Sequence, residues 1–458
     1  MVVHVAIYPW LPFGHVNPFI QLSNRLALHG FNISFLATRD NIPKIQPLRR
    51  FPDQIQIVAL DLPLPPTQIA TRTDSDPHPD SPVFKLTQLL RATDSLQAQV
   101  ETALSQLKPE IVVYEFAQYI PSIAHALGIK AVFYGVTSAT AIAYHFVPAC
   151  SDQQDFTHPP VGFPPTGVAL RGHEARQLLF AFIAPDGLLS LHQRVVMAMK
   201  DADMIILKTC AEMENKYCDY ISEQYKKPVV MAGPGLNDEP QTDTLDERWA
   251  RWLDQFPAGS VLYCSFGSED ILSKEQLREL LLGLEESGVP FMAVLKYPDG
   301  MTQDEALPEG LVERVKERAL IHSGWVQQQL ILEHKAVGGY LCHAGFGSLA
   351  EAVASGRQLV LLPQKGDQFL NARLMSTDLK VGVEVERRDE DGWFTRQSVC
   401  KAVRSVMVEK EGPVGKEVRT NNFRLKELLL NKDLKSSYVD QMVQKLRDLV
   451  VIKEVKQA

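Results

Sequence analysis

The chain has 458 residues, which predicts two domains of about 200–240 residues rather than one. Its hydrophobic fraction of 45% is that of a globular protein with an ample core. The formal net charge of −8 argues against nucleic acid or an anionic membrane as the main partner.

The cysteines and the apolar runs indicate in which cellular compartment the protein works. None of the 6 cysteines lies in a C-x-x-C pair, so neither a disulfide framework nor a zinc site is indicated. No apolar run reaches about 18 residues, and no signal-peptide pattern opens the chain. We therefore expect a cytoplasmic protein without a membrane span.

The first 38 residues predict strand, loop, helix and strand, at residues 2–8, 9–15, 16–29 and 31–38. Such a βαβ unit is typical of a parallel sheet that binds ligands at the C-terminal ends of its strands. The buried face of the predicted helix comprises Phe19, Ile20, Leu22, Leu26 and Leu28.

The rest of the first half continues this alternation. A proline-rich surface loop at 61–82 separates the βαβ unit from a long helix at 85–107. Residues 231–247 are polar and contain prolines and glycines, so they predict a linker between two domains. Further elements are expected at 111–115 (strand), 119–127 (helix) and 173–200 (helical).

The second half repeats the pattern from a strand at 260–268 onward. Ser273 and Gln276 form a capping box ahead of a helix at 274–287. The remaining expected elements are strands at 289–295, 319–323, 337–343 and 381–386 and helices at 309–317, 397–408 and 437–453.

A glycine turn follows the strand at 337–343. The strand ends at His343, and Ala344-Gly345-Phe346-Gly347 leads into a helix predicted to begin near Ser348. A helix start behind such a turn directs free N–H groups at a ligand and is a natural seat for phosphate. His343 and Ser348 add side-chain donors, although Ser348 and Glu351 also fit a purely structural capping box.

The stretch 325–368 resembles the plant secondary product glycosyltransferase box, the donor signature of plant family 1 UDP-dependent glycosyltransferases. The resemblance implies that Trp325 stacks on uracil and that the other box residues hold the ribose, the diphosphate and the sugar. Taken singly, a tryptophan such as Trp325 is more commonly a buried core residue than a stacking platform. A single histidine such as His343 is more commonly a hydrogen-bonded structural residue than a ligand contact. The residues that the resemblance places at the UDP-sugar are Gly14, Thr137, Ser268, Trp325, Val326, Gln328, His343, Gly345, Phe346, Gly347, Ser348, Glu351, Asp367 and Gln368.

Within the box, Gln328 and Glu351 are implied to hold ribose hydroxyls, and Asp367 and Gln368 hydroxyls of the sugar. His343, Gly347 and Ser348 are implied to meet the diphosphate. Where the family has asparagine, Gly347 leaves only its backbone N–H for that contact.

The departures from the common box point to one branch of the family. The combination of WVQQ at 325–328 with HAGFGS at 343–348 resembles enzymes that extend the sugar of a flavonoid or anthocyanin 3-O-glycoside at its 2″ or 6″ hydroxyl. A terpenoid glycoside and a phenolic aglycone remain alternative acceptors. The donor sugar also stays open among glucose, xylose, rhamnose and glucuronate.

The catalytic pair is expected in the first domain. By resemblance, His15 at the first βα connection is the general base, and an imidazole with an unperturbed pKa of about 6.5 suits that work. Glu115 stands where the family has the aspartate that orients this histidine. Its extra methylene would move the carboxylate by about 1.5 Å unless the backbone compensates. An error of that size matters because displacements near 1 Å lower rates about a hundredfold.

These features predict a GT-B fold, with two Rossmann-like doubly wound α/β domains that face a cleft. The expected units are an acceptor domain at 1–235, a UDP-sugar domain at 236–435 and a C-terminal helix at 436–458 that packs back on the first domain. No G-x-G-x-x-G or P-loop motif is found, and no Asp-x-Asp motif stands where a metal-dependent glycosyltransferase would need one. We therefore expect inverting, metal-independent transfer with UDP-sugar as co-substrate and no cofactor. We expect a monomer. A UDP-sugar epimerase and a non-catalytic UDP-sugar binder are the alternatives from other classes.

Overall fold

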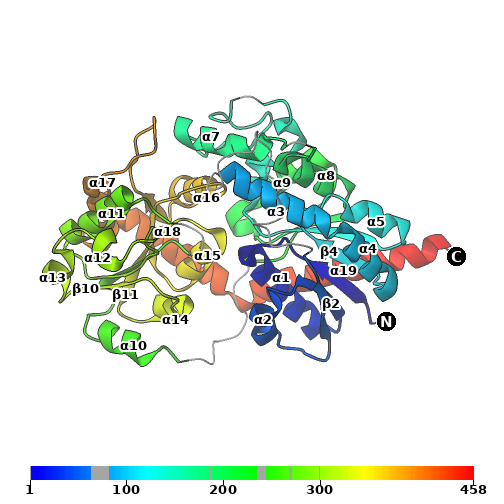
Figure 1. Cartoon of the computed structure of the whole chain (residues 1–458), viewed down its shortest axis with the longest axis horizontal. Helices are drawn as coiled ribbons and strands as arrows, with labels where there is room; N and C mark the ends of the chain where they lie inside the picture. Colours follow the sequence, from blue (N-terminus) through cyan, green and yellow to red (C-terminus); the bar gives the residue numbers. More distant parts are fainter. Residues whose placement is uncertain are drawn as a thin grey trace.

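The computed structural model describes residues 2–62, 82–153, 155–185, 187–234, 244–267, 271–298 and 300–457. Figure 1 shows two lobes side by side along the long axis, each a twisted sheet with helices packed around it. The first lobe carries the N-terminal half of the chain, and the second carries most of the C-terminal half. No helix that the structure describes is both long and apolar enough to cross a membrane.

The first sheet is entirely parallel, with the strand order β3-β2-β1-β4-β5-β6-β7. The order reverses between β1 and β4, which pair directly and end together at Tyr8 and Tyr114. The seven strands are β1 (His4–Tyr8), β2 (Asn32–Thr38), β3 (Ile55–Leu60), β4 (Ile111–Tyr114), β5 (Lys130–Gly135), β6 (Met204–Leu207) and β7 (Val229–Met231).

The second sheet repeats this plan with the order β10-β9-β8-β11-β12-β13, again all parallel. Here the reversal lies between β8 and β11, which end together at Ser265 and Cys342. The six strands are β8 (Val261–Ser265), β9 (Phe291–Val294), β10 (Ala319–His322), β11 (Val337–Cys342), β12 (Gln358–Leu361) and β13 (Gly382–Glu384).

Helices cover both sheets, and their apolar stripes make the cores. In the first lobe they are α1 (Phe13–Leu28), α2 (Ile42–Ile45), α3 (Pro82–Ser95), α4 (Gln97–Leu107), α5 (Ile120–Ala126), α6 (Ala139–His145), α7 (Gly172–Leu178), α8 (Leu191–Asp201) and α9 (Ala211–Tyr225). The remaining helices are α10 (Glu247–Leu253), α11 (Lys274–Ser287), α12 (Gln303–Ala306), α13 (Leu311–Val315), α14 (Gln328–Glu333), α15 (Phe346–Ala354), α16 (Gln368–Arg373), α17 (Arg396–Met407), α18 (Pro413–Leu430) and α19 (Lys432–Gln457).

The first helix begins earlier than its sequence predicts. Pro12 serves as the N-cap, and its carbonyl accepts the N–H groups of His15 and Val16, so His15 lies in the first turn of α1 rather than in a loop. Leu28, predicted as buried, is 65% exposed. It stands about 200° around the helix from the buried Leu26, since each residue advances the helix by about 100°.

Two long predicted helices are broken in the structure. The segment 85–107 forms α3 and α4, separated at Leu96, and 173–200 forms α7, a short 3-10 helix at Leu179–Phe182 and then α8. The capping box of Ser273 and Gln276 at the start of α11 is present as predicted. The helices α9 and α18 are features that the sequence reading did not identify.

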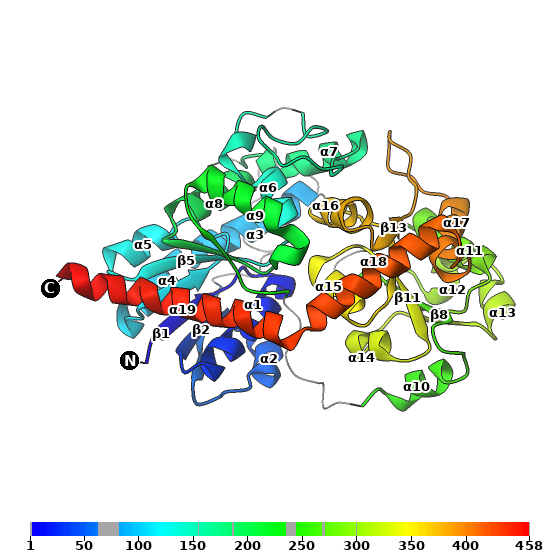
Figure 2. The ribbon, with the colours of Figure 1, turned by 180° about the vertical axis from the view of Figure 1, so that it is seen from behind.

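The C-terminal helix α19 crosses back to the first lobe (Figure 2). Met442, Val443 and Leu446 belong to the buried cluster that also contains residues of β1 and α1. The Tyr438 hydroxyl accepts the Ala211 N–H at 2.8 Å and donates to the Glu212 carboxylate at 2.9 Å. The domain boundary predicted between residues 235 and 236 falls in the segment 235–243. This segment lies outside the described residues, so the boundary stays a prediction.

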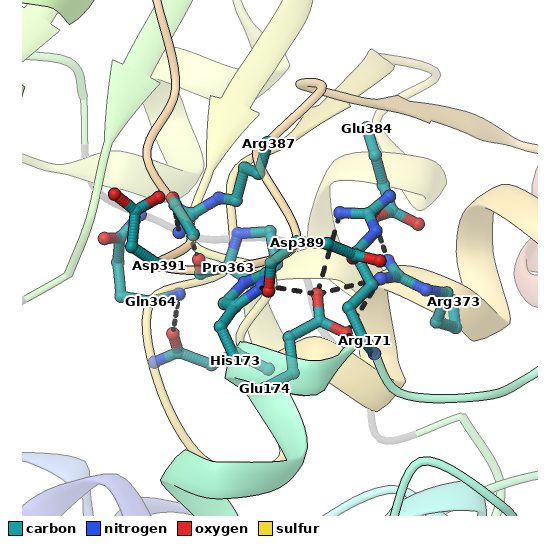
Figure 3. Close-up of polar contacts among 12 residues, drawn as sticks. Arg171, His173, Glu174, Pro363, Gln364, Arg373, Glu384, Arg387, Asp389 and Asp391 are labelled. Carbon is teal, nitrogen blue, oxygen red and sulfur yellow. Dashed lines mark hydrogen bonds and ion pairs between the residues drawn. The ribbon is translucent and has the colours of Figure 1, made fainter.

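A buried polar cluster joins the two lobes, as Figure 3 shows. Glu174 of α7 accepts two hydrogen bonds from Arg373 of α16, at 2.8 and 2.9 Å, and both side chains are buried. Arg373 also pairs with Glu384 of β13, and the His173 N–H donates to the Asp389 carbonyl at 3.2 Å. We call the first of these contacts the Glu174–Arg373 brace.

Breaking the brace should cost far more stability than breaking an exposed ion pair. Arg373→Met would remove both guanidinium hydrogen bonds from the buried Glu174 and leave it with Arg171, whose N–H lies at 2.8 Å and guanidinium at 3.7 Å. We expect unfolding to become easier by about 3–5 kcal/mol. The exposed Arg251–Glu247 pair supplies a matched control, because Arg251→Met should cost below about 1 kcal/mol. Denaturant midpoints of the two variants would measure this, and equal shifts would contradict a structural role for the brace.

Candidate active site

The candidate site lies where the strand order of each sheet reverses. In doubly wound sheets, ligands bind outside the carboxyl ends of the strands at such a reversal. His15 and Glu115 follow β1 and β4 in the first sheet, while Gly267 and His343 follow β8 and β11 in the second. His15, Glu115 and His343, predicted from the sequence, therefore lie at the two reversal points.

His15 and Glu115 form a close pair within the first lobe. The His15 Nδ1 lies 2.7 Å from a carboxylate oxygen of Glu115, whose side chain is fully buried. The other Glu115 oxygen accepts the Val136 N–H at 3.3 Å. This geometry places the ring proton on Nδ1 and makes Nε2 the basic nitrogen.

The extra methylene of Glu115 does not prevent the contact. Glu115 comes directly after β4, and the next residue, Phe116, has φ of 24°, in the left-handed region that few non-glycine residues adopt. The backbone therefore turns sharply behind the carboxylate, which still reaches the imidazole.

The glycine turn of the second lobe differs from its prediction in one respect. The helix α15 begins at Phe346 with Gly345 as N-cap, so Ser348 and Glu351 do not form the capping box. The first ladder bond runs from the Leu349 N–H to the Gly345 carbonyl at 3.0 Å. The N–H groups of residues 346–348 therefore lie outside the helical ladder at the positive end of the helix.

Two glycines make room for the His343 imidazole. A Cβ added at Gly345 would lie 2.6 Å from Nε2 of His343, and one at Gly267 would lie 3.1 Å from its Cε1. Gly267 also has φ of 71°. Since Ala344 has φ of 65°, the chain turns back sharply after His343 and brings the ring beside the start of α15.

The polar residues behind the turn form a connected network. Gln328 accepts hydrogen bonds from the Ser265 hydroxyl at 3.0 Å and the Tyr340 hydroxyl at 3.3 Å, and it donates to the Ser348 hydroxyl at 3.3 Å. Burial raises the pKa of the Glu351 carboxyl, and the nearby Lys208 ammonium and the Gln328 side chain partly offset this effect.

Trp325 is not a core residue. Its side chain is 83% exposed, whereas the following Val326 is buried. An exposed indole on a loop that enters α14 is available to stack on a planar group. The structural alternative considered for this residue is therefore wrong.

Asp367 and Asn371 connect the lobes at the centre of the site. Asn371 donates to Asp367 at 3.0 Å and to the Ala344 carbonyl at 3.0 Å, and it accepts the Ser138 hydroxyl of the first lobe at 2.5 Å. Burial raises the pKa of Asp367, with partial offsets from the Asn371 hydrogen bond and from the charges of His15 and His343. The carboxylate thus lies within electrostatic reach of a histidine from each lobe.

Three further residues that the resemblance places at the UDP-sugar are Gln368, Thr137 and Gly14. The Gln368 side-chain oxygen accepts the backbone N–H groups of Gln364 and Lys365 at 2.8 and 3.1 Å, which shapes the loop before α16. The buried Thr137 hydroxyl finds no hydrogen-bond partner among the described residues. Gly14 is exposed in the first turn of α1.

Ser268 lies outside the described residues, so its placement stays a prediction. In the part of the chain that the structure describes, no three His, Cys, Asp or Glu residues gather in a way that could hold a metal ion.

Aromatic rings lead away from the catalytic pair. Trp10 packs on His15 and Phe116 at centroid distances of 4.9 and 4.8 Å. Phe146 follows at 6.2 Å from Phe116, and His192 stacks on Phe146 at 6.5 Å. Phe146 comes directly after α6, and His192 lies in the first turn of α8. Sequence reading missed Trp10, although its place in the first βα connection was a usable signal.

The two doubly wound parallel sheets, with the His15–Glu115 pair at the edge of one and the start of α15 at the edge of the other, have the arrangement of a GT-B glycosyltransferase. The family model described as UDP-glucoronosyl and UDP-glucosyl transferase matches residues 187–418. The chain belongs to this family and is a UDP-dependent glycosyltransferase.

Similar proteins cover the whole chain. An anthocyanidin-3-O-glucoside rhamnosyltransferase of Petunia hybrida is 42% identical, over 97% of this chain and 96% of the relative. A cyanidin 3-O-galactoside 2″-O-xylosyltransferase of Actinidia chinensis var. chinensis is 44% identical, over 98% of both chains. UGT73P12 of Glycyrrhiza uralensis, solved with glycyrrhetinic acid 3-O-monoglucuronide, matches with a TM-score of 0.80 at 21% identity, over 100% of this chain and 98% of that one. The predicted fold and enzyme class are confirmed.

The packing of His343 gives a steric prediction. Gly345→Ala would place a methyl group 2.6 Å from the imidazole and force the ring out of position. If this ring contacts the donor diphosphate, the dissociation constant for UDP should rise about tenfold, the equivalent of one charge-assisted hydrogen bond. Isothermal titration calorimetry would measure it, with the unfolding midpoint as a control for the fold. Unchanged UDP affinity would contradict a ligand role for His343.

Proposed function

We propose that the enzyme transfers a sugar, with inversion, from a UDP-sugar to the sugar of a flavonoid or anthocyanin 3-O-glycoside. One observation carries the proposal: hydrogen bonds from Ser138 to Asn371 and from Asn371 to Asp367 join the lobes beside the His15–Glu115 pair, and the charge of His15 lowers the pKa of Asp367. A proton acceptor from one lobe therefore faces a sugar-binding carboxylate from the other.

The donor binds to the second lobe. The exposed Trp325 stacks on uracil, and Gln328 with Glu351 holds the ribose. The N–H groups at the start of α15, with His343 and Ser348, take the diphosphate, whose charge the helix N-terminus stabilises without a metal ion. Asp367 and Gln368 bind sugar hydroxyls. Ser268, Thr137, Val326, Gly14, Gly345 and Phe346 are assigned to the donor by family resemblance.

Transfer is a single displacement. His15 Nε2 removes the proton from the acceptor hydroxyl while Glu115 stabilises the resulting imidazolium through Nδ1. The acceptor oxygen bonds to the anomeric carbon as the bond from that carbon to the diphosphate oxygen breaks. The electron pair leaves with UDP, where donors at the start of α15 stabilise the developing charge.

The acceptor assignment is supported by the aromatic path and by the relatives. Rings from Trp10 to His192 begin at the base and offer a surface for a flat polycyclic group. The names of the Petunia and Actinidia relatives specify anthocyanidin and cyanidin 3-O-glycosides, and the Actinidia name specifies the 2″ hydroxyl. We therefore favour the 2″ position over the 6″ position. These relatives use different sugars, so the donor identity is left to experiment.

We also propose that the enzyme works in the cytoplasm as a monomer. All six cysteines are free thiols and five of them are buried, which suits a reducing compartment. The base, its orienting carboxylate and the donor seat all come from a single chain.

Replacing the base tests the mechanism. His15→Ala should lower kcat by about 10²–10⁴-fold, because proton removal by a positioned base contributes that much. UDP should still bind to the second lobe, which calorimetry can verify on the same sample. Glu115→Asp should retain more activity than Glu115→Gln because it keeps the charge. Turnover of His15→Ala at the wild-type rate would remove this residue from the mechanism.

A donor-by-acceptor screen tests the function itself. UDP-linked glucose, xylose, rhamnose, galactose and glucuronate would be offered with anthocyanin and flavonol 3-O-glucosides, their aglycones and a terpenoid glycoside. We expect one added sugar, detected by mass, on the flavonoid glycosides and none on the aglycones. Product on aglycones or terpenoid glycosides alone would contradict the acceptor assignment.

A further inference from the structure

Lys208 follows β6 at the same edge of the first sheet as the catalytic pair. Its N–H donates to the Gly135 carbonyl at 2.9 Å, so the main chain is fixed to β5. The next residue, Thr209, is held by its hydroxyl contact to Glu214 at 2.6 Å. The start of the Lys208 side chain therefore has a defined position.

The side chain reaches across to the second lobe. Lys208 is only 7% exposed, and its Nζ lies 3.9 Å from the place that a Cβ of Gly347 would take. Gly347 is in the first turn of α15, among the N–H groups outside the helical ladder. The first lobe thus delivers an ammonium group to the glycine turn of the second.

The ammonium forms no hydrogen bond or ion pair with the residues that the structure describes. Glu351 of α15 attracts it from beyond ion-pair distance, and Arg25 of α1 repels it, while burial is the largest effect and lowers its pKa to about 8. A buried cation is costly unless an anion compensates it. The charge of the ammonium is therefore only partly compensated by the protein, and a negatively charged ligand would complete the compensation.

We propose that Lys208 binds the diphosphate of the UDP-sugar and supplies the side-chain contact that Gly347 lacks. The inference rests on the proposed donor seat at the start of α15. An ammonium is a compact charge with three donors, well suited to phosphate oxygens. Because Lys208 belongs to the other lobe, the donor becomes a bridge between lobes, and the leaving diphosphate gains a cation only when both are in place.

Calorimetry on the full chain tests this with Lys208→Met. UDP should bind about tenfold more weakly or worse, while uridine, which has no phosphate, should bind unchanged. Lys200→Met, at an exposed lysine of the same lobe, is the matched control and should leave both affinities unchanged. The unfolding midpoint of Lys208→Met, measured on the same sample, separates a loss of UDP affinity from a loss of the fold.

The pH dependence gives a second readout. The ammonium form binds phosphate, so the UDP affinity of the wild-type chain should fall as pH rises above about 8. Lys208→Met should lack this decline. The charged groups that act on Lys208, Glu351 and Arg25, remain in both proteins.

A rescue experiment separates binding from packing. An asparagine at Gly347 would place its amide where the ammonium lies, so Gly347→Asn should restore part of the UDP affinity lost in Lys208→Met.

Equal losses for UDP and uridine in Lys208→Met, or no loss for UDP, would overturn the inference. If Trp325→Ala weakens UDP while Lys208→Met does not, the inference alone fails. If neither weakens UDP, the proposed donor seat fails with it.

Discussion

The reaction site depends on holding the carboxyl edges of two parallel sheets against one another. In the proposed mechanism each edge offers half of the chemistry, a base with its carboxylate on one side and a phosphate seat on the other. The hydrogen bond from Ser138 to Asn371 joins them at the centre, and the Glu174–Arg373 brace joins them at the periphery. The helix α19 adds an apolar contact by ending on the first lobe.

Burial of charge is the second common feature of this interface. Glu115 and Lys208 are buried, and partial burial raises the pKa of the Asp367 and Glu351 carboxyls. Charges kept in this way interact strongly with a ligand because water does not screen them. The packing of the two cores offsets the free-energy cost of burying these charged groups, so the site can remain organised before the substrates bind.

Much of the fold was predictable because the strands are short apolar runs that alternate with amphipathic helices. The reversal points follow from the strand order, which the sequence does not reveal directly. His15 and His343 were named because the chain resembles the family at these residues, and each lies at or after the end of a predicted strand. Element boundaries were less certain. Pro12 caps α1 and Gly345 caps α15, and both helices begin two or three residues ahead of their predictions.

Contacts between residues far apart in the chain were beyond sequence reasoning. Asn371 and Lys208 carry no motif of their own, and their importance comes only from what folding places beside them: Ser138 and Ala344 in one case, Gly347 in the other. The Glu115 carboxylate reaches His15 despite its extra methylene, a result that depends on the backbone turn at Phe116. Such compensation is a property of three-dimensional geometry.

A crystal structure of the enzyme with UDP would show where each part of the donor binds. We expect uracil stacked on the Trp325 indole, with the diphosphate on the N–H groups at the start of α15 and within hydrogen-bond distance of His343. The His15 imidazole would face the open end of the diphosphate from the opposite lobe. Uracil bound away from Trp325, or a diphosphate seated on the first lobe, would contradict the proposed donor seat.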